Sequence, residues 1–345
     1  MNKKKTVKPT ILVTGGAGFI GSHTAVALLQ NDYKVVIVDN FYNSKPFALK
    51  AIRKITGKKF VFMEGDVANK TFMRKVFKEN KIDAVIHFAG YKAVGESVGK
   101  PLKYYRNNLD TTLTLLEVMQ QYNCKKIVFS SSATVYAKSE VMPLTEQSPV
   151  GNATNPYGET KIMIERILSD LAIADPQWSI IALRYFNPIG AHESGLIGEE
   201  PNGIPNNLMP YIVKVATGQL DKLRVYGNDY PTPDGTGIRD YIHVEDLANA
   251  HLGALKALDS QSGIDYVNVG TGKGTSVLEL VKAFEKANKI KIPYEIIGRR
   301  PGDLPEVWAD PSYAKKKIHF TAKKNLVTMC KDSYRFELAN SKRNK

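Results

Sequence analysis

The chain has 345 residues, 43% of them hydrophobic and 24% charged, which is the composition of an ordinary soluble globular protein. Because a single hydrophobic core stops growing near roughly 250–300 residues, we expect two lobes. The two cysteines exclude a disulfide framework, and neither has metal-ligand spacing around it, so we expect a reducing environment and no bound metal.

The formal net charge of +14 favours anionic partners, among them nucleotides, nucleotide-sugars and nucleic acid. The basic residues are scattered and form no stripe interleaved with aromatic residues, so we expect no nucleic-acid partner. No stretch approaches the roughly 20 apolar residues of a membrane span. The apolar run at residues 11–13 is interrupted at once by glycine, too early for a secretory signal. We therefore expect a cytoplasmic protein without a membrane partner.

A glycine-rich turn follows the first predicted strand. Residues 10–14 predict a buried strand, residues 17–30 predict a helix, and Gly15, Gly18 and Gly21 form a G-x-x-G-x-x-G turn between them. Glycines let the backbone turn tightly and approach a pyrophosphate, and the helix start offers free N–H groups. A helix cap with packing glycines is the alternative. The complete strand–helix–strand context makes dinucleotide binding the better interpretation.

The second predicted strand, residues 34–38, ends at Asp39. An acidic residue at this position accepts hydrogen bonds from the adenosine ribose hydroxyls and repels a 2′-phosphate. The sequence therefore favours NAD over NADP.

Strand and helix signals continue to alternate along the first half of the chain. The predicted strands are residues 60–63, 84–88, 126–129 and 179–183, and the predicted helices are residues 71–79, 101–122 and 156–174. This order implies an α/β fold with a doubly wound parallel (Rossmann) sheet covered on both faces. Ser132 follows one of these strands, at the edge where such sheets bind ligands. It is either a turn residue or, more specifically, a hydrogen-bonding group for substrate.

Tyr157 and Lys161 lie four residues apart in a predicted helix that begins at Pro156, so their side chains fall on one face. A phenol titrates near 10 and is a poor base at neutral pH. A fixed ammonium beside it favours the phenolate. We expect this pair to take a proton from a sugar hydroxyl while hydride leaves the same carbon. The motif is short, so an exposed helix with an incidental Tyr and Lys is the alternative.

The second half of the chain is less regular. Residues 188–240 are rich in Gly, Pro, Asn and Asp and contain one clear predicted helix, residues 208–217. Their aromatic and aliphatic content indicates an ordered substrate lobe. A helix at residues 244–258 and a strand at residues 266–269 predict a return to the sheet, and the polar tail 341–345 is expected to fray. The expected domains are an NAD-binding Rossmann domain, residues 1–187 with 244–270, and a smaller α/β substrate lobe, residues 188–243 and 271–345.

Characteristic sequence runs occur in both halves of the chain, in one continuous alignment between residues 10 and 330. They are residues 13–24, 87–90, 92–98, 129–136, 155–158, 183–188, 203–211, 234–244 and 299–305. Together they resemble the extended short-chain dehydrogenase/reductase family and, within it, the enzymes that epimerise UDP-sugars at C4. The runs in the second half make this resemblance far more specific than the glycine turn alone.

The resemblance implies an enzyme that interconverts UDP-glucose and UDP-galactose by transient oxidation at C4, with its NAD regenerated in each cycle. It implies a homodimer that pairs through the helices at residues 101–122 and 156–174. It assigns proton transfer to Tyr157, stabilisation of the phenolate to Lys161 and hydrogen bonding of the 4-oxygen to Ser132.

The resemblance also implies binding residues. The expected NAD contacts are Gly15, Gly18, Phe19, Ile20, Gly21, Asp39, Asn40, Phe41, Tyr42, Asn43, Ser44, Asp66, Val67, Phe88, Ala89, Gly90, Tyr91, Lys92, Asn107, Ser132, Tyr157, Lys161 and Phe186. The expected UDP-sugar contacts are Lys92, Ser132, Tyr157, Asn187, Asn207, Leu208, Arg224, Val225, Tyr226, Arg239, Arg300, Asp303 and Val307. Arginine suits a diphosphate because it presents a fork of donors. A pair of surface salt bridges is the alternative for Arg239 and Arg300.

Val307 departs from the commonest pattern of the family, in which a tyrosine narrows the sugar pocket. A valine leaves room for an acetamido group, which predicts activity on UDP-GlcNAc and UDP-GalNAc as well. The alternative is that Val307 packs against Trp308 or Pro305.

Two rival functions remain. A 4,6-dehydratase of this family would carry an Asp-Glu pair where Ala133 and Thr134 stand, so the acid for water elimination is missing; a nucleotide-sugar decarboxylase is a related possibility. A non-catalytic NAD-sensing scaffold can dispense with the tyrosine, lysine and serine, all of which are present here.

Overall fold

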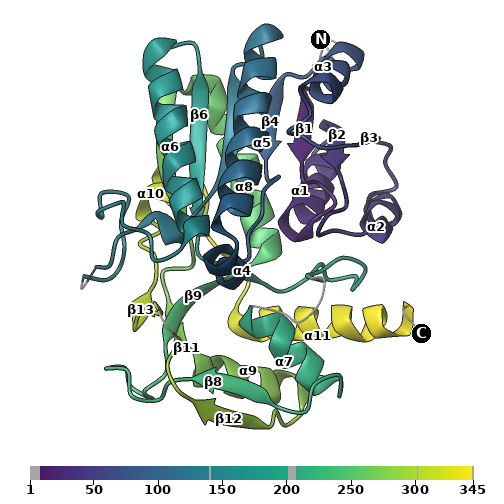
Figure 1. The fold of residues 1–345 in the computed structure, drawn as a ribbon. Helices are drawn as coiled ribbons and strands as arrows, with labels where there is room; N and C mark the ends of the chain where they lie inside the picture. The colour runs from purple at the N-terminus through teal and green to yellow at the C-terminus, as the bar shows by residue number, and fades with distance from the viewer. Residues whose placement is uncertain (1–7, 140, 201–206, 301, 344–345) are drawn as a thin grey trace.

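The computed structural model describes residues 8–139, 141–200, 207–300 and 302–343, and its centre is a seven-stranded parallel sheet (Figure 1). The strand order is β10-β6-β5-β4-β1-β2-β3, and every neighbouring pair is parallel. The strands are β1 (Thr10–Thr14), β2 (Lys34–Asp39), β3 (Val61–Glu64), β4 (Ala84–His87), β5 (Lys126–Ser132), β6 (Ser179–Tyr185) and β10 (Gly263–Val269). The order reverses between β1 and β4, which creates the switch point where such sheets bind ligands.

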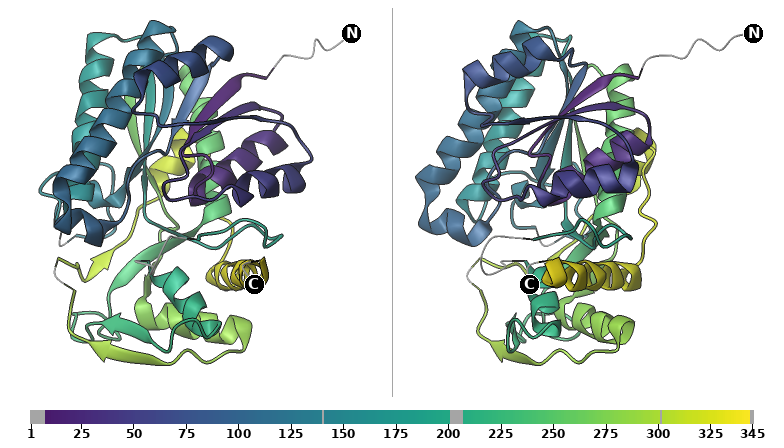
Figure 2. Two further views of the ribbon diagram at one scale, coloured as in Figure 1. Left: turned by 45° about the vertical axis from the view of Figure 1, so that its right-hand side comes forward. Right: turned by 90° about the vertical axis from the view of Figure 1, so that its right-hand side faces the viewer.

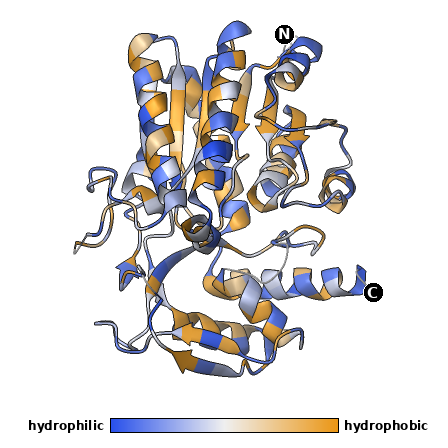
Figure 3. Ribbon diagram, viewed as in Figure 1, coloured by the Kyte–Doolittle hydropathy of each residue, from blue (hydrophilic) through white to orange (hydrophobic). Residues whose placement is uncertain are grey.

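Helices cover both faces of this sheet, so its strands are apolar along most of their length (Figure 3). One face packs against α1 (Phe19–Gln30), α2 (Phe47–Thr56), α8 (Val244–Ala257) and α10 (Ser312–Lys317). The other face packs against α3 (Lys70–Glu79), α5 (Pro101–Gln121) and α6 (Pro156–Ala174). Side chains alternate between these two cores along β1, where Ile11 and Val13 enter one core and Leu12 enters the other.

A smaller α/β domain lies beyond the carboxyl ends of the sheet strands (Figures 1 and 2). Its main sheet is built on β9 (Ile238–His243), which pairs with β7 (Asn187–Ile189), β11 (Gly274–Ser276) and β13 (Glu306–Val307). A second sheet pairs β8 (Leu223–Tyr226) with β12 (Tyr294–Ile297). The helices α7 (Leu208–Ala216), α9 (Val277–Asn288) and α11 (Leu326–Arg343) enclose a separate core around Phe284. The short elements α4 (Val94–Gly99), η1 (Ala133–Val135) and η2 (Leu258–Ser260) complete the described structure.

The predicted fold class is confirmed, and the differences lie at element ends and in the second half. The helix predicted from residue 17 begins at Phe19, because residues 15–18 remain in the turn. The strands predicted to end at residues 129 and 183 continue to Ser132 and Tyr185. The loop-rich stretch 188–240 contains β8 and parts of β7 and β9 besides its predicted helix, because pairing with distant strands overrides its turn-rich composition.

The chain's C-terminal end also differs from expectation. The tail expected to fray from residue 341 continues α11 as far as Arg343, while residues 344–345 lie outside the described residues. The guanidinium carbon of Arg343 lies 3.7 Å from the ring centre of Phe47, so the end of α11 is fixed against the start of α2. Of the motif at 203–211, residues 203–206 lie outside the described residues.

Both cysteines are buried and unpaired. Burial raises the pKa of the Cys124 and Cys330 thiols to about 12, which keeps them protonated and unreactive. Among the described helices, none has an apolar stretch long enough to cross a lipid bilayer.

A buried ion pair fixes α6 to the sheet. Nη2 of Arg184 on β6 lies 2.7 Å from Oε2 of Glu165 on α6, and the two side chains are only 4% and 5% exposed. The Ser131 hydroxyl donates a further hydrogen bond to Glu165 at 2.6 Å. Tyr136 and Tyr266 enclose the guanidinium at 5.0 and 4.6 Å from their ring centres. This helix carries the predicted catalytic pair, so the ion pair also positions the site.

Replacing Arg184 with Met should lower the free energy of unfolding by about 3–5 kcal/mol, because Glu165 would keep a buried, unpaired charge. Urea denaturation measures this loss. The control is Arg166→Met on the same helix, which breaks an exposed pair with Asp170, the side chains being 78% and 56% exposed. The control substitution should lower the free energy of unfolding by less than about 1 kcal/mol. Equal losses in the two variants would contradict the role of the buried pair.

Candidate active site at the junction of the two domains

The glycine turn brings two backbone segments into close contact. Gly15 has φ of +68°, and a Cβ there would lie 3.0 Å from the backbone nitrogen of Ala89. A Cβ on Gly21 would lie 2.3 Å from the carbonyl oxygen of Gly15. The N-cap of α1 is Gly18, which has no side chain to satisfy the first N–H groups of the helix. A cradle of this kind can accommodate a pyrophosphate.

Asp39 joins the glycine turn to the loop after β2. Its Oδ2 accepts from the backbone N–H of Ala17 at 2.9 Å. Its Oδ1 accepts from the N–H of Phe41 at 2.9 Å and from the Ser44 hydroxyl at 2.7 Å. A carboxylate offers about four acceptor positions, so capacity remains for a ribose hydroxyl. Asp39 could therefore also accept a hydrogen bond from a ribose hydroxyl of the dinucleotide predicted from the sequence.

Asn108 is a buried residue that the sequence analysis missed. Its Oδ1 accepts from the N–H of Tyr91 at 2.7 Å, and its Nδ2 donates to the Tyr91 carbonyl at 3.1 Å and to the Thr160 hydroxyl at 3.0 Å. The predicted NAD contact Asn107 donates to Asn108 at 3.0 Å. Asn108 thus ties the loop after β4 to the helix that carries Lys161.

The start of α6 places the predicted catalytic pair on one face. Oδ1 of Asn155 caps the helix by accepting from the N–H of Gly158 at 2.9 Å. Nζ of Lys161 lies 5.8 Å from the centre of the Tyr157 ring and donates to the Ser130 carbonyl at 2.6 Å. The predicted i, i+4 geometry is therefore present at the carboxyl edge of the sheet.

The electrostatics of the pair differ from the simple expectation. Burial raises the pKa of Tyr157 above its usual value, and a hydrogen bond with the Ser132 side chain opposes this. Burial lowers the pKa of Lys161 to about 8, against the opposing charge of Glu165. Among the protein's own groups, desolvation rather than the neighbouring ammonium dominates the pKa of Tyr157.

Ser132 ends β5 and caps η1. Its Oγ accepts from the N–H of Thr134 at 3.2 Å and from the Thr134 hydroxyl at 3.0 Å. With its acceptor positions used locally, the Ser132 hydroxyl keeps its proton to donate to another oxygen. From the sequence alone, Thr134 stands out only as a position where a dehydratase would carry an acid. In the structure it orients the Ser132 hydroxyl.

The predicted diphosphate-binding arginines lie in the smaller domain. Nη1 of Arg239 donates to the carbonyls of Ile238 and Leu304 at 2.8 and 2.9 Å. Its Nη2 lies 3.4 Å from the carboxylate of Asp303, itself a predicted UDP contact, so the salt-bridge alternative describes part of its environment. The guanidinium carbon of Arg300 lies 4.5 Å from the ring centre of Tyr226.

Several other predicted UDP-sugar residues lie in the smaller domain, and the structure does not bring all of them to the junction. Val225 is 1% exposed in the core of the smaller domain, whereas Arg224 on the opposite face pairs with Glu295 at 3.5 Å. Asn187 is exposed at the start of β7, Leu208 begins α7, and Val307 lies on β13 beside the small core that contains Phe186. The remaining predicted NAD contacts lie at or just after the ends of the strands or on α1: Ile20, Asn40, Tyr42, Asn43, Asp66, Val67, Phe88 and Gly90.

Glu199 is a second residue that the sequence analysis missed. Its Oε1 accepts from Nζ of Lys92 at 2.8 Å and from Nδ2 of Asn207 at 3.0 Å. It therefore links two predicted substrate contacts from opposite sides of the junction. Its lysine partner lies 107 residues away in the sequence, so no local signal identifies the pair.

The sheet, the glycine turn, the acidic residue after β2 and the Tyr–Lys pair define the class of NAD-dependent enzymes with an extended short-chain dehydrogenase/reductase fold. A profile of the NAD dependent epimerase/dehydratase family matches residues 11–270, and the chain belongs to this family.

Individual relatives cover almost the whole chain. The UDP-glucose 4-epimerase of Bacillus subtilis is 58% identical over 330 residues, which cover 96% of this chain and 97% of that protein. The crystal structure of UDP-glucose 4-epimerase from Bifidobacterium longum in complex with NAD+ and UDP has a TM-score of 0.94 at 54% identity and covers 96% and 99% of the two chains. The UDP-Glc/GlcNAc 4-epimerase of Campylobacter jejuni has a TM-score of 0.84 at 35% identity and covers 96% and 99%.

The lowered pKa of Lys161 predicts a pH dependence of stability. Because the folded protein holds this proton less tightly than the unfolded chain, stability should rise with pH between about 8 and the ordinary value of 10.5. Relative to Lys161→Met, the NAD-free wild type should gain roughly 3 kcal/mol over this range. Urea denaturation of both proteins at several pH values measures the difference.

Lys54→Met is the control, because Lys54 is exposed in the last turn of α2. The difference in free energy of unfolding between the wild type and Lys54→Met should not rise with pH over this range. If the free energy of unfolding of the wild type relative to Lys161→Met stayed flat or fell as the pH rose, the Lys161 ammonium would not be held in an unfavourable environment.

Proposed function

We propose that this protein inverts the C4 configuration of UDP-hexoses, interconverting UDP-glucose and UDP-galactose, with NAD as its retained cofactor. The observation that carries the proposal is the convergence of Tyr157, Lys161 and Ser132 at the carboxyl edge of the sheet, next to the glycine turn. The names and bound molecules of the close relatives support the same reaction.

NAD would be held by the glycine turn, by Asp39 and its loop, and by the loop after β4, and it supplies the acceptor and donor of the C4 hydride. Tyr157 takes the proton from the sugar 4-hydroxyl and returns it after the sugar has turned. Ser132 donates a hydrogen bond to the 4-oxygen and relays the proton. Lys161 supplies a positive charge beside the phenol, which favours the phenolate, while burial remains the larger effect on the pKa of Tyr157.

The UDP part remains bound while the sugar turns. Arg239 and Arg300 offer forked donors to the diphosphate, and Asn187, Asn207 and Asp303 surround it. Binding energy from this remote part of the substrate allows the sugar itself to be loosely held, as inversion requires. In this proposal residues 1–187 and 244–270 serve NAD, and residues 188–243 and 271–345 serve the UDP-sugar, except that α10 packs against the large sheet.

We further propose a homodimer that pairs through α5 and α6. These adjacent helices expose the apolar side chains of Leu113, Met163 and Ile173, which are 41%, 37% and 75% exposed. Exposed apolar side chains on two adjacent helices favour an interface there.

The rival functions lack support from the geometry. A dehydratase needs a carboxylic acid next to Ser132, whereas Thr134 occupies that position and hydrogen-bonds the serine. A scaffold does not require a buried lysine with a pKa lowered to about 8 beside a buried phenol.

Replacing Tyr157 with Phe should reduce turnover by about 10²–10⁴-fold, the usual contribution of a general acid–base group. The assay incubates the protein with UDP-galactose without added NAD and follows UDP-glucose by NMR. A new methyl signal would indicate a dehydratase. Near-wild-type epimerisation by the phenylalanine variant would remove Tyr157 from the mechanism.

We also propose activity on UDP-GlcNAc and UDP-GalNAc. Val307 pairs with Arg239 in the sheet and packs beside the Phe186 core, so a larger side chain at this position would narrow the space next to the diphosphate-binding arginine. The dual specificity named for the Campylobacter jejuni relative supports the idea that this scaffold accepts both sugars.

Val307→Tyr should abolish turnover of UDP-GalNAc, because the ring would fill the acetamido space, while UDP-galactose turnover remains within about fivefold of wild type. Parallel assays with the two substrates measure the ratio. Val307→Ile is the matched control and should retain both activities. Loss of neither activity in the tyrosine variant would exclude Val307 as the gate.

A further inference from the structure

Two adjacent glutamates on the segment between the domains are nearly buried. Glu199 and Glu200 lie on the strap, which we define as residues 190–200, between β7 and α7 (Figure 1). Their side chains are only 9% and 12% exposed. Burying a carboxylate is costly unless a partner compensates its charge, so a pair of buried glutamates requires an explanation.

Each glutamate pairs with a lysine from a different loop of the sheet edge. Glu200 pairs with Lys45, which directly follows the predicted NAD contacts 39–44. Glu199 pairs with Lys92 at 2.8 Å, at the end of the predicted NAD contacts 88–92. The strap is therefore fastened to both loops that would enclose the cofactor.

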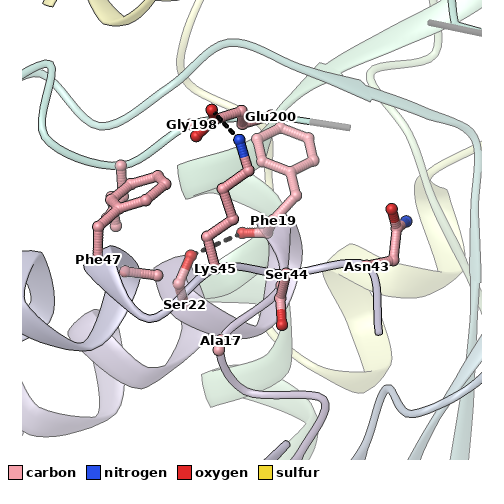
Figure 4. A pocket seen from close by; sticks show the side chains of 12 residues that line it. Ala17, Phe19, Ser22, Asn43, Ser44, Lys45, Phe47, Gly198 and Glu200 are labelled. Atoms are coloured by element: carbon pink, nitrogen blue, oxygen red, sulfur yellow. Dashed lines mark hydrogen bonds and ion pairs between the residues drawn. The ribbon is translucent and has the colours of Figure 1, made fainter. Parts of the chain in front are cut away.

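The first of these pairs crosses a cavity beside the glycine turn. Figure 4 shows Lys45 extending past Phe19 and Phe47 to the carboxylate of Glu200. The same cavity is lined by residues of the glycine turn and of the loop after β2: Ala17, Gly18, Asn43 and Ser44. The pair thus spans the region predicted to hold the pyrophosphate and ribose.

The C-terminal helix α11 also packs beside the Lys45–Glu200 pair. Arg343 of α11 stacks on Phe47, which also lines the cavity, and the charge of Glu200 raises the pKa of Arg343 against the larger effect of burial. Asn207 binds Glu199 from the start of α7. The smaller domain is consequently joined to the cofactor loops through the strap.

We propose that the pairs Lys45–Glu200 and Lys92–Glu199 form a latch that slows the release of NAD, a role that rests on the proposed function. Glutamates beside a pyrophosphate site would repel the dinucleotide, so their contribution is to hold the strap and not to bind the cofactor. An epimerase stores the hydride on its cofactor between the two transfers, so slow release prevents loss of the cofactor while the keto sugar is bound. The latch makes release depend on opening the strap.

Glu200→Gln is the decisive variant because the two explanations of Lys45 predict opposite results. If the latch retains NAD, the variant should release NAD about 5- to 20-fold faster than the wild type, since truncating one partner of a charge pair acts mainly on dissociation. If Lys45 instead attracts the phosphates directly, freeing it from Glu200 should slow release. Protein loaded with NAD is rapidly desalted, and free NAD in filtrates is assayed over time.

A charge swap and a distant pair complete the test. Lys45→Glu combined with Glu200→Lys should restore slow release, whereas a merely structural role would not be rescued. Lys70→Met, which breaks the Lys70–Glu117 pair at 2.6 Å between α3 and α5, should leave the release rate unchanged. If the wild type retains NAD and Glu200→Gln releases it no faster, the latch is wrong. If the wild type binds no NAD, the proposed function fails first.

Discussion

The burial of the central sheet on both faces is the constraint on which the rest of the structure depends. With helices covering each face, side chains such as Leu12 and Val13 must be apolar, so the strands themselves cannot carry chemistry. Polar groups that could face a ligand therefore lie mainly where the strands end. Because all seven strands are parallel, their carboxyl ends meet at one edge, and the glycine turn, Asp39, Ser132 and the loop after β4 meet there.

The same burial imposes a cost on the groups that act at this edge. Lys161 is 6% exposed, and its compensation comes from the Ser130 carbonyl and the more distant charge of Glu165. Glu165 is in turn fixed by Arg184 and Ser131. The site is therefore less stable than an apolar core of the same shape would be, and it is held in place by an ion pair behind it.

The sequence predicts those parts of the site that depend on local geometry. Tyr157 and Lys161 share a face because of helical spacing, and Gly15 follows directly from the need for a left-handed turn. Asp39 could be found because it ends a strand. Each of these relationships involves a few neighbouring residues within or beside one regular element. The pattern of residue types is therefore sufficient to predict them.

The missed residues depend on tertiary placement. Asn107 and Asn108 are chemically identical, and only the rotation of α5 against the sheet decides which of them is buried. Glu199 belongs to a stretch that reads as irregular loop, and its partner comes from a different domain. The strands β8 and β12 are short and about seventy residues apart, so neither has a recognisable partner in the sequence.

The position of β10 has a consequence for synthesis of the chain. This strand covers the edge of β6, yet it is contributed by residues 263–269, after the first segment of the smaller domain, β7 to β9, has been passed. While the ribosome makes the intervening segment, β6 is an open edge with unpaired backbone groups, a surface prone to joining other strands. Completion of the large sheet must therefore wait until part of the smaller domain has been made, and the edge of β6 stays open in the nascent polypeptide during that interval.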